Sequence, residues 1–182
     1  MKIIRTHIED VIIIEPDIYR DARGFFLESY NKSVFDKLGV EVNFVQDNRS
    51  LSTRGVLRGL HFQKGDSAQA KLVSVISGTV LDIAVDIRKG SKTFGQHVST
   101  ELNSETKRMM FIPRGFAHGF IVLSESAEFI YKCDNYYNPS SEGGIRFDDP
   151  DINLDWRLDK EELIISDKDK KLPYFKEILD KL

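Results

Sequence analysis

Short apolar runs, separated by turn residues roughly every ten positions, recur along most of the chain. Residues 11–14 predict a short buried strand, and residues 23–30 predict the next one. Residues 43–48 also predict a strand, although its polar positions are typical of an edge strand that faces water. Residues 70–76 and 79–87 are joined by a Ser-Gly pair, and together they predict a β-hairpin.

Alternation of apolar and other positions predicts that one face of the strand at residues 79–87 is apolar. The two alternating sets are Leu81, Ile83, Val85 and Ile87 on one side and Asp82, Ala84, Asp86 and Arg88 on the other. Further strands are predicted at residues 96–102, 109–112, 120–123 and 127–132.

Helix is predicted only in two short segments, one near each end of the chain. Asn31 is expected to cap a helix that ends at Gly39, and an amphipathic helix is expected after Pro173. The apolar positions are Val34, Phe35 and Leu38 in the first helix and Phe175, Ile178, Leu179 and Leu182 in the second. Many short strands with helix only at the margins indicate an all-β fold, an antiparallel β-sandwich or barrel. Without an internal repeat or a linker, residues 1–182 are interpreted as one domain.

Composition excludes several classes of protein. The 182 residues suffice for a substantial core, and they contain no apolar run of transmembrane length. Charges interrupt the first ten residues, so we expect no signal peptide and a cytoplasmic protein. The single cysteine, Cys133, cannot form an internal disulfide and argues against a cysteine metal site. A net charge of -3 provides no basic surface for nucleic acid, although local cations could still bind a small anion.

Two glycine-punctuated stretches, residues 55–63 and 113–120, each carry one histidine, His61 and His118. Between them Lys71 stands in an otherwise apolar strand, so these side chains could form a cationic site in an apolar wall. A lone histidine is more often an ordinary core or surface residue, but two of only four in this context favour a site. No His-X-His sequence is present and two histidines are too few for tight metal binding, so neither a metal nor another cofactor is expected.

The chain resembles the dTDP-4-dehydrorhamnose 3,5-epimerases, a family of cupin-type jelly-roll enzymes of deoxysugar biosynthesis. Eight segments in the family's order carry this resemblance: RGFFLE at 23–28, FVQDN at 44–48, VLRGLHFQ at 56–63, QAKLV at 69–73, DIRKGS at 86–91, PRGFAHGF at 113–120, YKCDNYYNP at 131–139 and SDKD at 166–169. Each segment alone is weak, whereas their joint occurrence in order makes chance an inadequate explanation.

The resemblance implies a role for four catalytic residues. His61 is the expected base, Asp169 orients and charges it, Tyr131 is the acid across the sugar, and Lys71 stabilises an enolate. The implied substrate is a dTDP-linked 4-keto-6-deoxy sugar. Its expected contacts are Arg23, Phe26, Glu28, Gln46, Asn48, Arg58, His118, Tyr137, Glu142 and Lys168. Family members are homodimers with shared active sites, so Arg23 and Glu28 are expected to serve the neighbouring site.

The residue types suit this chemistry. A carbon beside a ketone loses a proton to a weak base if a cation meets the developing oxyanion. Histidine, with an unperturbed pKa of about 6.5, supplies such a base, and a phenol, with a pKa of about 10, stays protonated as the acid. Inversion requires that the proton return from the opposite face.

Each catalytic candidate also has an ordinary explanation when it is taken alone. Tyr131 could be a half-buried strand aromatic, Asp169 a solvated turn residue, and Lys71 a charge at a sheet edge. Two alternatives to the 3,5-epimerase therefore stay open. One is a single-centre epimerase acting on a related nucleotide-linked 4-keto sugar, and the other is a binding protein without activity.

Overall fold

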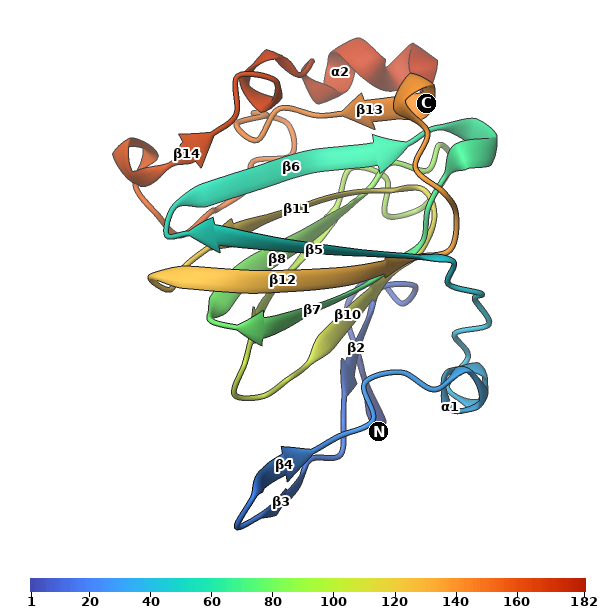
Figure 1. Ribbon diagram of the computed structural model, residues 1–182. Helices are drawn as coiled ribbons and strands as arrows, with labels where there is room; N and C mark the ends of the chain where they lie inside the picture. Colours follow the sequence, from blue (N-terminus) through green and yellow to red (C-terminus); the bar gives the residue numbers. More distant parts are fainter.

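Two β-sheets face each other in the computed structural model, which describes residues 1–182 except the side chain of Lys181 (Figure 1). The first sheet has the order β1 (Lys2–Arg5), β2 (Ile12–Glu15), β10 (Met109–Ile112), β7 (Lys71–Ser77), β12 (Ser126–Cys133) and β5 (Gln46–Thr53). The second has the order β13 (Glu142–Gly144), β6 (Val56–Gln63), β11 (Phe116–Val122), β8 (Thr79–Asp86) and β9 (His97–Asn103). β14 (Ile164–Ile165) pairs in parallel with β6, and β3 (Tyr19–Asp21) pairs with β4 (Gly24–Phe26) in a separate hairpin.

Helical segments are short and lie at the periphery (Figure 1). The α-helices are α1 (Lys32–Lys37) and α2 (Phe175–Ile178), and the 3₁₀ turns are η1 (Gly65–Ser67), η2 (Pro139–Ser141), η3 (Lys160–Glu162), η4 (Asp169–Lys171) and η5 (Leu179–Lys181). The Asn31 side chain accepts a hydrogen bond from the backbone N–H of Ser33, which confirms the predicted cap. The expected all-β jelly-roll sandwich with peripheral helices is therefore present.

The predicted hairpin over residues 70–87 is wrong in its pairing, although both strands exist. β7 pairs with β10 and β12, whereas β8 pairs with β9 and β11, so the chain passes from one sheet to the other at Gly78. A Cβ on Gly78 would lie 2.1 Å from the carbonyl oxygen of Ser126, and its φ of +80° favours glycine. Two strands joined by a tight turn have the same sequence pattern whether they pair with each other in a hairpin or belong to two facing sheets.

Apolar side chains fill three clusters. The cluster between the sheets includes Val73, Val75 and Phe129 from the first sheet and Ala84 and Phe120 from the second. We interpret residues 1–182 as one domain because both sheets contribute to this core.

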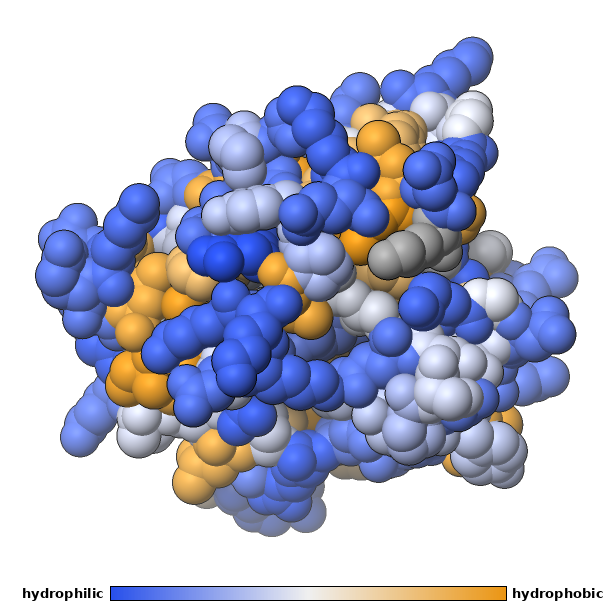
Figure 2. Space-filling view, turned by 90° about the horizontal axis from the view of Figure 1, so that it is seen from above, coloured by the Kyte–Doolittle hydropathy of each residue, from blue (hydrophilic) through white to orange (hydrophobic). Residues whose placement is uncertain are grey.

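The outer face of each sheet is also covered in part. On the second sheet, Leu81 and Ile83 pack with Trp156 and Phe175 from the C-terminal segments. The apolar face predicted for residues 79–87 is therefore confirmed, and the opposite face of β8 is buried as well. Seen from above, the surface over these segments is largely hydrophilic with separate hydrophobic patches (Figure 2).

Two other predicted strands differ in extent. Of residues 23–30, only Gly24–Phe26 forms a strand, in a hairpin that projects away from the sandwich (Figure 1). Of residues 43–48, only the last three belong to β5, which continues to Thr53. β5 ends the order of the first sheet, so its predicted position as an edge strand is confirmed.

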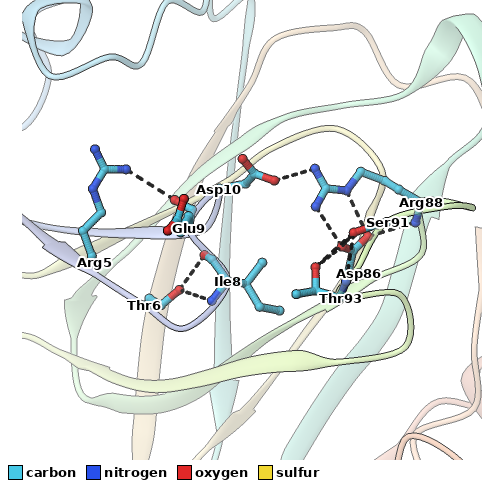
Figure 3. Close-up of polar contacts among 9 residues, drawn as sticks. All are labelled: Arg5, Thr6, Ile8, Glu9, Asp10, Asp86, Arg88, Ser91 and Thr93. Carbon is cyan, nitrogen blue, oxygen red and sulfur yellow. Dashed lines mark hydrogen bonds and ion pairs between the residues drawn. The ribbon is translucent and has the colours of Figure 1, made fainter.

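A polar network fastens the N-terminal loop to the second sheet (Figure 3). Arg88 donates hydrogen bonds to the buried Asp86 and to Asp10, which precedes β2. Ser91 and Thr93 donate further hydrogen bonds to Asp86. These bonds outweigh burial, which by itself raises the pKa of Asp86, and the pKa lies well below its usual range. Asp86 is therefore a charged structural anchor.

Candidate active site

A pocket of about 640 Å³ opens between the two sheets beside the C-terminal segments. Its lining residues are Asn48, Arg49, Ser50, Val56, Leu57, Arg58, His61, Lys71, His118, Phe120, Phe129, Tyr131, Ile164, Ile165, Ser166, Lys168 and Asp169. The structure thus brings together all four predicted catalytic residues and four of the predicted substrate contacts, Asn48, Arg58, His118 and Lys168.

His61 on β6 and Asp169 in η4 form a hydrogen-bonded pair, with 2.7 Å between Nε2 and Oδ1. The side chain of His61 is 33% exposed and that of Asp169 only 6%. Burial by itself raises the pKa of Asp169. Hydrogen bonds with His61, the backbone N–H of Gly59 and Ser166 outweigh burial, so the pKa lies below its ordinary value. A carboxylate only accepts hydrogen bonds, so Nε2 carries the proton and Nδ1 is the basic atom.

The pairing of β14 with β6 brings Asp169 to His61, although the two residues lie 108 positions apart. The N–H of Ile164 donates to the carbonyl of Gly55, at 2.8 Å. Gly55 has a φ of +80°, and a Cβ there would lie 2.1 Å from the carbonyl oxygen of Glu162. A glycine at this position therefore allows the C-terminal segment to approach β6 closely enough to supply the carboxylate.

A second histidine–aspartate pair lies deeper. His118 on β11 faces His61 in register on the neighbouring strand. Its Nε2 lies 3.0 Å from each carboxylate oxygen of Asp82, and the two side chains are 7% and 0% exposed. Burial lowers the pKa of His118 and raises the pKa of Asp82, although each partner opposes the shift of the other.

Asp82 is the site residue that the sequence analysis missed. The alternation along residues 79–87 placed it on the face that was not apolar. A carboxylate between Leu81 and Ile83 in a strand that is buried on both faces needs a partner, and His118 is that partner. The pattern that could have revealed it is an isolated acid inside an apolar run.

The opposite wall carries Tyr131 on β12 and Lys71 on β7. The Nζ of Lys71 lies 5.7 Å from the centre of the Tyr131 ring. Burial raises the pKa of Tyr131 and lowers the pKa of Lys71, while the charge of Asp82 partly offsets the shift of Lys71. Burial also raises the pKa of the neighbouring Cys133 thiol to about 11, so it stays neutral.

Three predicted substrate contacts lie beside the pocket lining and are joined to it by hydrogen bonds. The Gln46 amide donates to the Asn48 side chain, at 3.0 Å. Lys168 donates to both oxygens of Glu142 at 2.7 Å, and the Tyr137 hydroxyl donates to the same carboxylate at 2.9 Å. These bonds place a tyrosine ring and a charged pair at the edge of the site.

The remaining three predicted contacts lie elsewhere. Arg23 and Phe26 belong to the projecting β3–β4 hairpin, and Arg23 forms an ion pair with Asp21 (Figure 1). Phe26 and Glu28 line a separate cavity of about 290 Å³, and Phe26 is 69% exposed. The structure therefore does not bring Arg23, Phe26 or Glu28 to the pocket of their own chain.

Among the residues that the structure describes, no three or more His, Cys, Asp or Glu side chains are grouped so that they could hold a metal ion. No helix in the described part of the chain is long and apolar enough to cross a membrane.

Comparison with known proteins gives consistent results. The sequence profile of the family described as dTDP-4-dehydrorhamnose 3,5-epimerase matches residues 5–177. The dTDP-4-dehydrorhamnose 3,5-epimerase of Salmonella typhimurium is 57% identical over 157 residues, 86% of each chain. That of Escherichia coli K12 is 53% identical over 173 residues, 94% of this chain and 93% of the relative.

Solved structures agree with these relatives. The dTDP-6-deoxy-D-glucose-3,5-epimerase of Legionella pneumophila, in complex with dTDP-4-keto-L-rhamnose, is 50% identical. It superimposes with a TM-score of 0.93 over 96% of this chain and 93% of that one. The expected cupin-type jelly roll is confirmed by this similarity.

Proposed function

The chain belongs to the dTDP-4-dehydrorhamnose 3,5-epimerase family, and from this membership we propose how its pocket carries out the reaction. The enzyme is an isomerase that converts dTDP-4-keto-6-deoxy-glucose into dTDP-4-keto-rhamnose. The observation that carries the proposed residue roles is the arrangement of a histidine–carboxylate base on one wall and a protonated phenol on the other.

The first step is the removal of a proton from a carbon beside the ketone. Nδ1 of His61 accepts this proton, and the electron pair of the C–H bond moves through the carbon framework to the keto oxygen. Asp169 holds Nε2–H at 2.7 Å and stabilises the imidazolium that forms. An enolate with negative charge on the former ketone oxygen results.

The enolate oxygen needs a fixed donor, and Lys71 is placed to supply one. Its side chain reaches the pocket from the first sheet, on the same wall as Tyr131. His118 reaches the same pocket from the second sheet. We assign a proton to the buried Asp82 carboxyl, which then donates to Nε2 of His118 and leaves Nδ1–H of the neutral imidazole as a further hydrogen-bond donor. Preorganised donors in a site of this kind stabilise developing charge more strongly than water does.

The second step returns a proton to the other face of the carbon. Tyr131 donates its hydroxyl proton, the ketone re-forms from the enolate, and the phenolate recovers a proton from solvent. Burial raises the pKa of Tyr131, so the phenol remains a protonated donor at neutral pH. The same two steps at the other carbon beside the ketone complete the 3,5-epimerisation. Binding alone would need no acid opposite a base.

The nucleotide half of the substrate is assigned to the cations and polar groups at the pocket edge. Arg58 and Lys168 suit the diphosphate, because charge-assisted hydrogen bonds to phosphate oxygens are strong. Gln46, Asn48, Glu142 and the Tyr137 ring suit the base and ribose. We also propose a cytoplasmic location for the protein, and its nucleotide-linked sugar substrate supports this.

Shared sites in a homodimer account for the position of the projecting hairpin. Arg23, Phe26 and Glu28 lie outside the pocket of their own chain, and the hairpin is exposed and rich in aromatic residues. A second copy that received this hairpin would obtain all three residues. Mixing inactive Arg23→Ala with inactive His61→Ala should then restore some turnover, since one site in each mixed dimer is intact. A fully active monomer by light scattering would contradict the proposal.

The reaction is tested by incubating the protein with dTDP-4-keto-6-deoxy-glucose in deuterated water. Deuterium should enter both carbons that flank the ketone, as followed by NMR. Exchange at only one carbon would indicate a single-centre epimerase, and binding without exchange would indicate a binding protein.

A further inference from the structure

The cations assigned to the diphosphate are held in different ways. Lys168 forms an ion pair with the carboxylate of Glu142. In the described part of the chain, no carboxylate forms an ion pair with Arg58, whose guanidinium is held by the hydroxyl of Ser52. Arg58 therefore keeps its full positive charge beside the pocket, because its partner is neutral.

The Ser52 contact uses a defined edge of the guanidinium group. Nε and Nη2 of Arg58 both donate to the single Oγ of Ser52, each at 3.2 Å. A guanidinium has five N–H groups, so three remain, two on Nη1 and one on Nη2. These three lie along the end of the side chain, where one N–H from each terminal nitrogen can bind two phosphate oxygens together.

Ser52 is itself firmly placed. It is 6% exposed on β5 and pairs with Ala127 of β12, whereas Arg58 lies on β6 in the other sheet. The Arg58–Ser52 contact therefore crosses between the sheets. It fixes the rotation of the guanidinium relative to both walls.

We propose that Ser52 is a positioning residue that orients Arg58 for end-on, bidentate binding of the substrate diphosphate. This proposal rests on the proposed function, since it assigns the diphosphate to the same site. A carboxylate in place of Ser52 would hold the guanidinium more tightly but would neutralise it, and an alanine would leave it to rotate. Serine keeps both the orientation and the charge.

The test compares Ser52→Ala with Thr53→Val, which removes the hydroxyl of the exposed neighbour on the opposite face of β5. Loss of a hydrogen bond to a charged group corresponds to about a tenfold effect. Ser52→Ala should therefore raise both KM and the Kd for dTDP by about tenfold while kcat changes less than about twofold. Thr53→Val should match the wild type, and Ser52→Thr should restore part of the affinity.

A double-mutant cycle separates positioning from a general structural effect. In an Arg58→Ala background, Ser52→Ala should weaken dTDP binding no further, because there is no guanidinium left to orient. An unchanged Kd in Ser52→Ala would overturn the proposal, as would an equal loss in the Arg58→Ala background. Binding of dTDP is measured without turnover, so this result is independent of whether the wild type exchanges deuterium.

Discussion

Two histidines line the pocket, and each forms a pair with an aspartate in different surroundings. His61 and His118 face each other in register on neighbouring strands, and each holds an aspartate through Nε2. The His61 side chain is 33% exposed, whereas that of His118 is 7% exposed and its partner Asp82 is fully buried. The pKa of Asp169 is lowered and that of Asp82 is raised.

This difference shows how burial assigns roles to identical groups. An imidazole beside a charged carboxylate and open to the pocket gains from accepting a proton, because the ion pair stabilises the product of that step. An imidazole in a deeply buried pair is held in its neutral form, and it can donate through Nδ1–H when its carboxyl partner is itself protonated and donates to Nε2. We therefore propose that the exposed pair moves protons and that the buried pair orients a donor.

The largest effects are expected when one of the two histidines is replaced at a time. His61→Asn should abolish both solvent exchange and product formation, with a loss of about a hundred- to ten-thousand-fold. His118→Asn should leave exchange measurable while lowering its rate, because a hydrogen-bond donor to the enolate is weakened and no base is lost. Deuterium incorporation by NMR distinguishes the variants. An equal loss of exchange in both variants would mean that the two histidine–aspartate pairs do not have separate roles in the reaction.

Removing the acid should separate exchange from inversion. In Tyr131→Phe the enolate still forms at His61 and is reprotonated there, so exchange with retention should survive while net inversion falls by roughly a hundredfold or more. Product and recovered substrate are analysed by NMR in deuterated water. Inversion at the wild-type rate would show that another group, such as water or Tyr137, delivers the proton.

The two aspartates should affect stability with opposite dependence on pH. The pKa of Asp169 is lowered in the folded protein, so its stabilising contribution is present above about pH 4 and is lost as the pH falls through the folded pKa. The pKa of Asp82 is raised, so its contribution is fully present below about pH 4 and declines as the pH rises through the folded pKa.

Urea unfolding measured from roughly pH 2 to pH 7 checks this expectation. The difference in the free energy of unfolding between wild type and Asp169→Asn should shrink on acidification. The difference between wild type and Asp82→Asn should grow. Parallel trends would show that the two carboxylates are in equivalent environments.

The smallest expected effect comes from chelation. In the proposed roles neither histidine binds a metal ion, and the Nε2 of each is already hydrogen-bonded to an aspartate. The purified protein should keep its rate after exhaustive chelation and should contain no stoichiometric transition metal. Loss of activity that added metal restores would require a different role for at least one histidine.

The sequence by itself determined the local structure. Alternating apolar positions and turn residues located most strands, the Asn31 cap and the edge position of β5, and glycine-punctuated runs marked His61 and His118. The eight ordered segments identified the family, which the comparisons confirm. These properties depend on neighbours along the chain, so a pattern of a few residues is sufficient to predict them.

Only the tertiary structure decided which strands pair and how deeply each polar group is buried. The chain at Gly78 passes between sheets where a hairpin was predicted, and the C-terminal segments cover the second face of β8. Asp82 lies on the opposite face of β8, which packs against the first sheet, and there it is the buried partner of His118. Strand pairing and burial depend on contacts between distant segments, and burial in turn sets the pKa values that distinguish the two histidine–aspartate pairs.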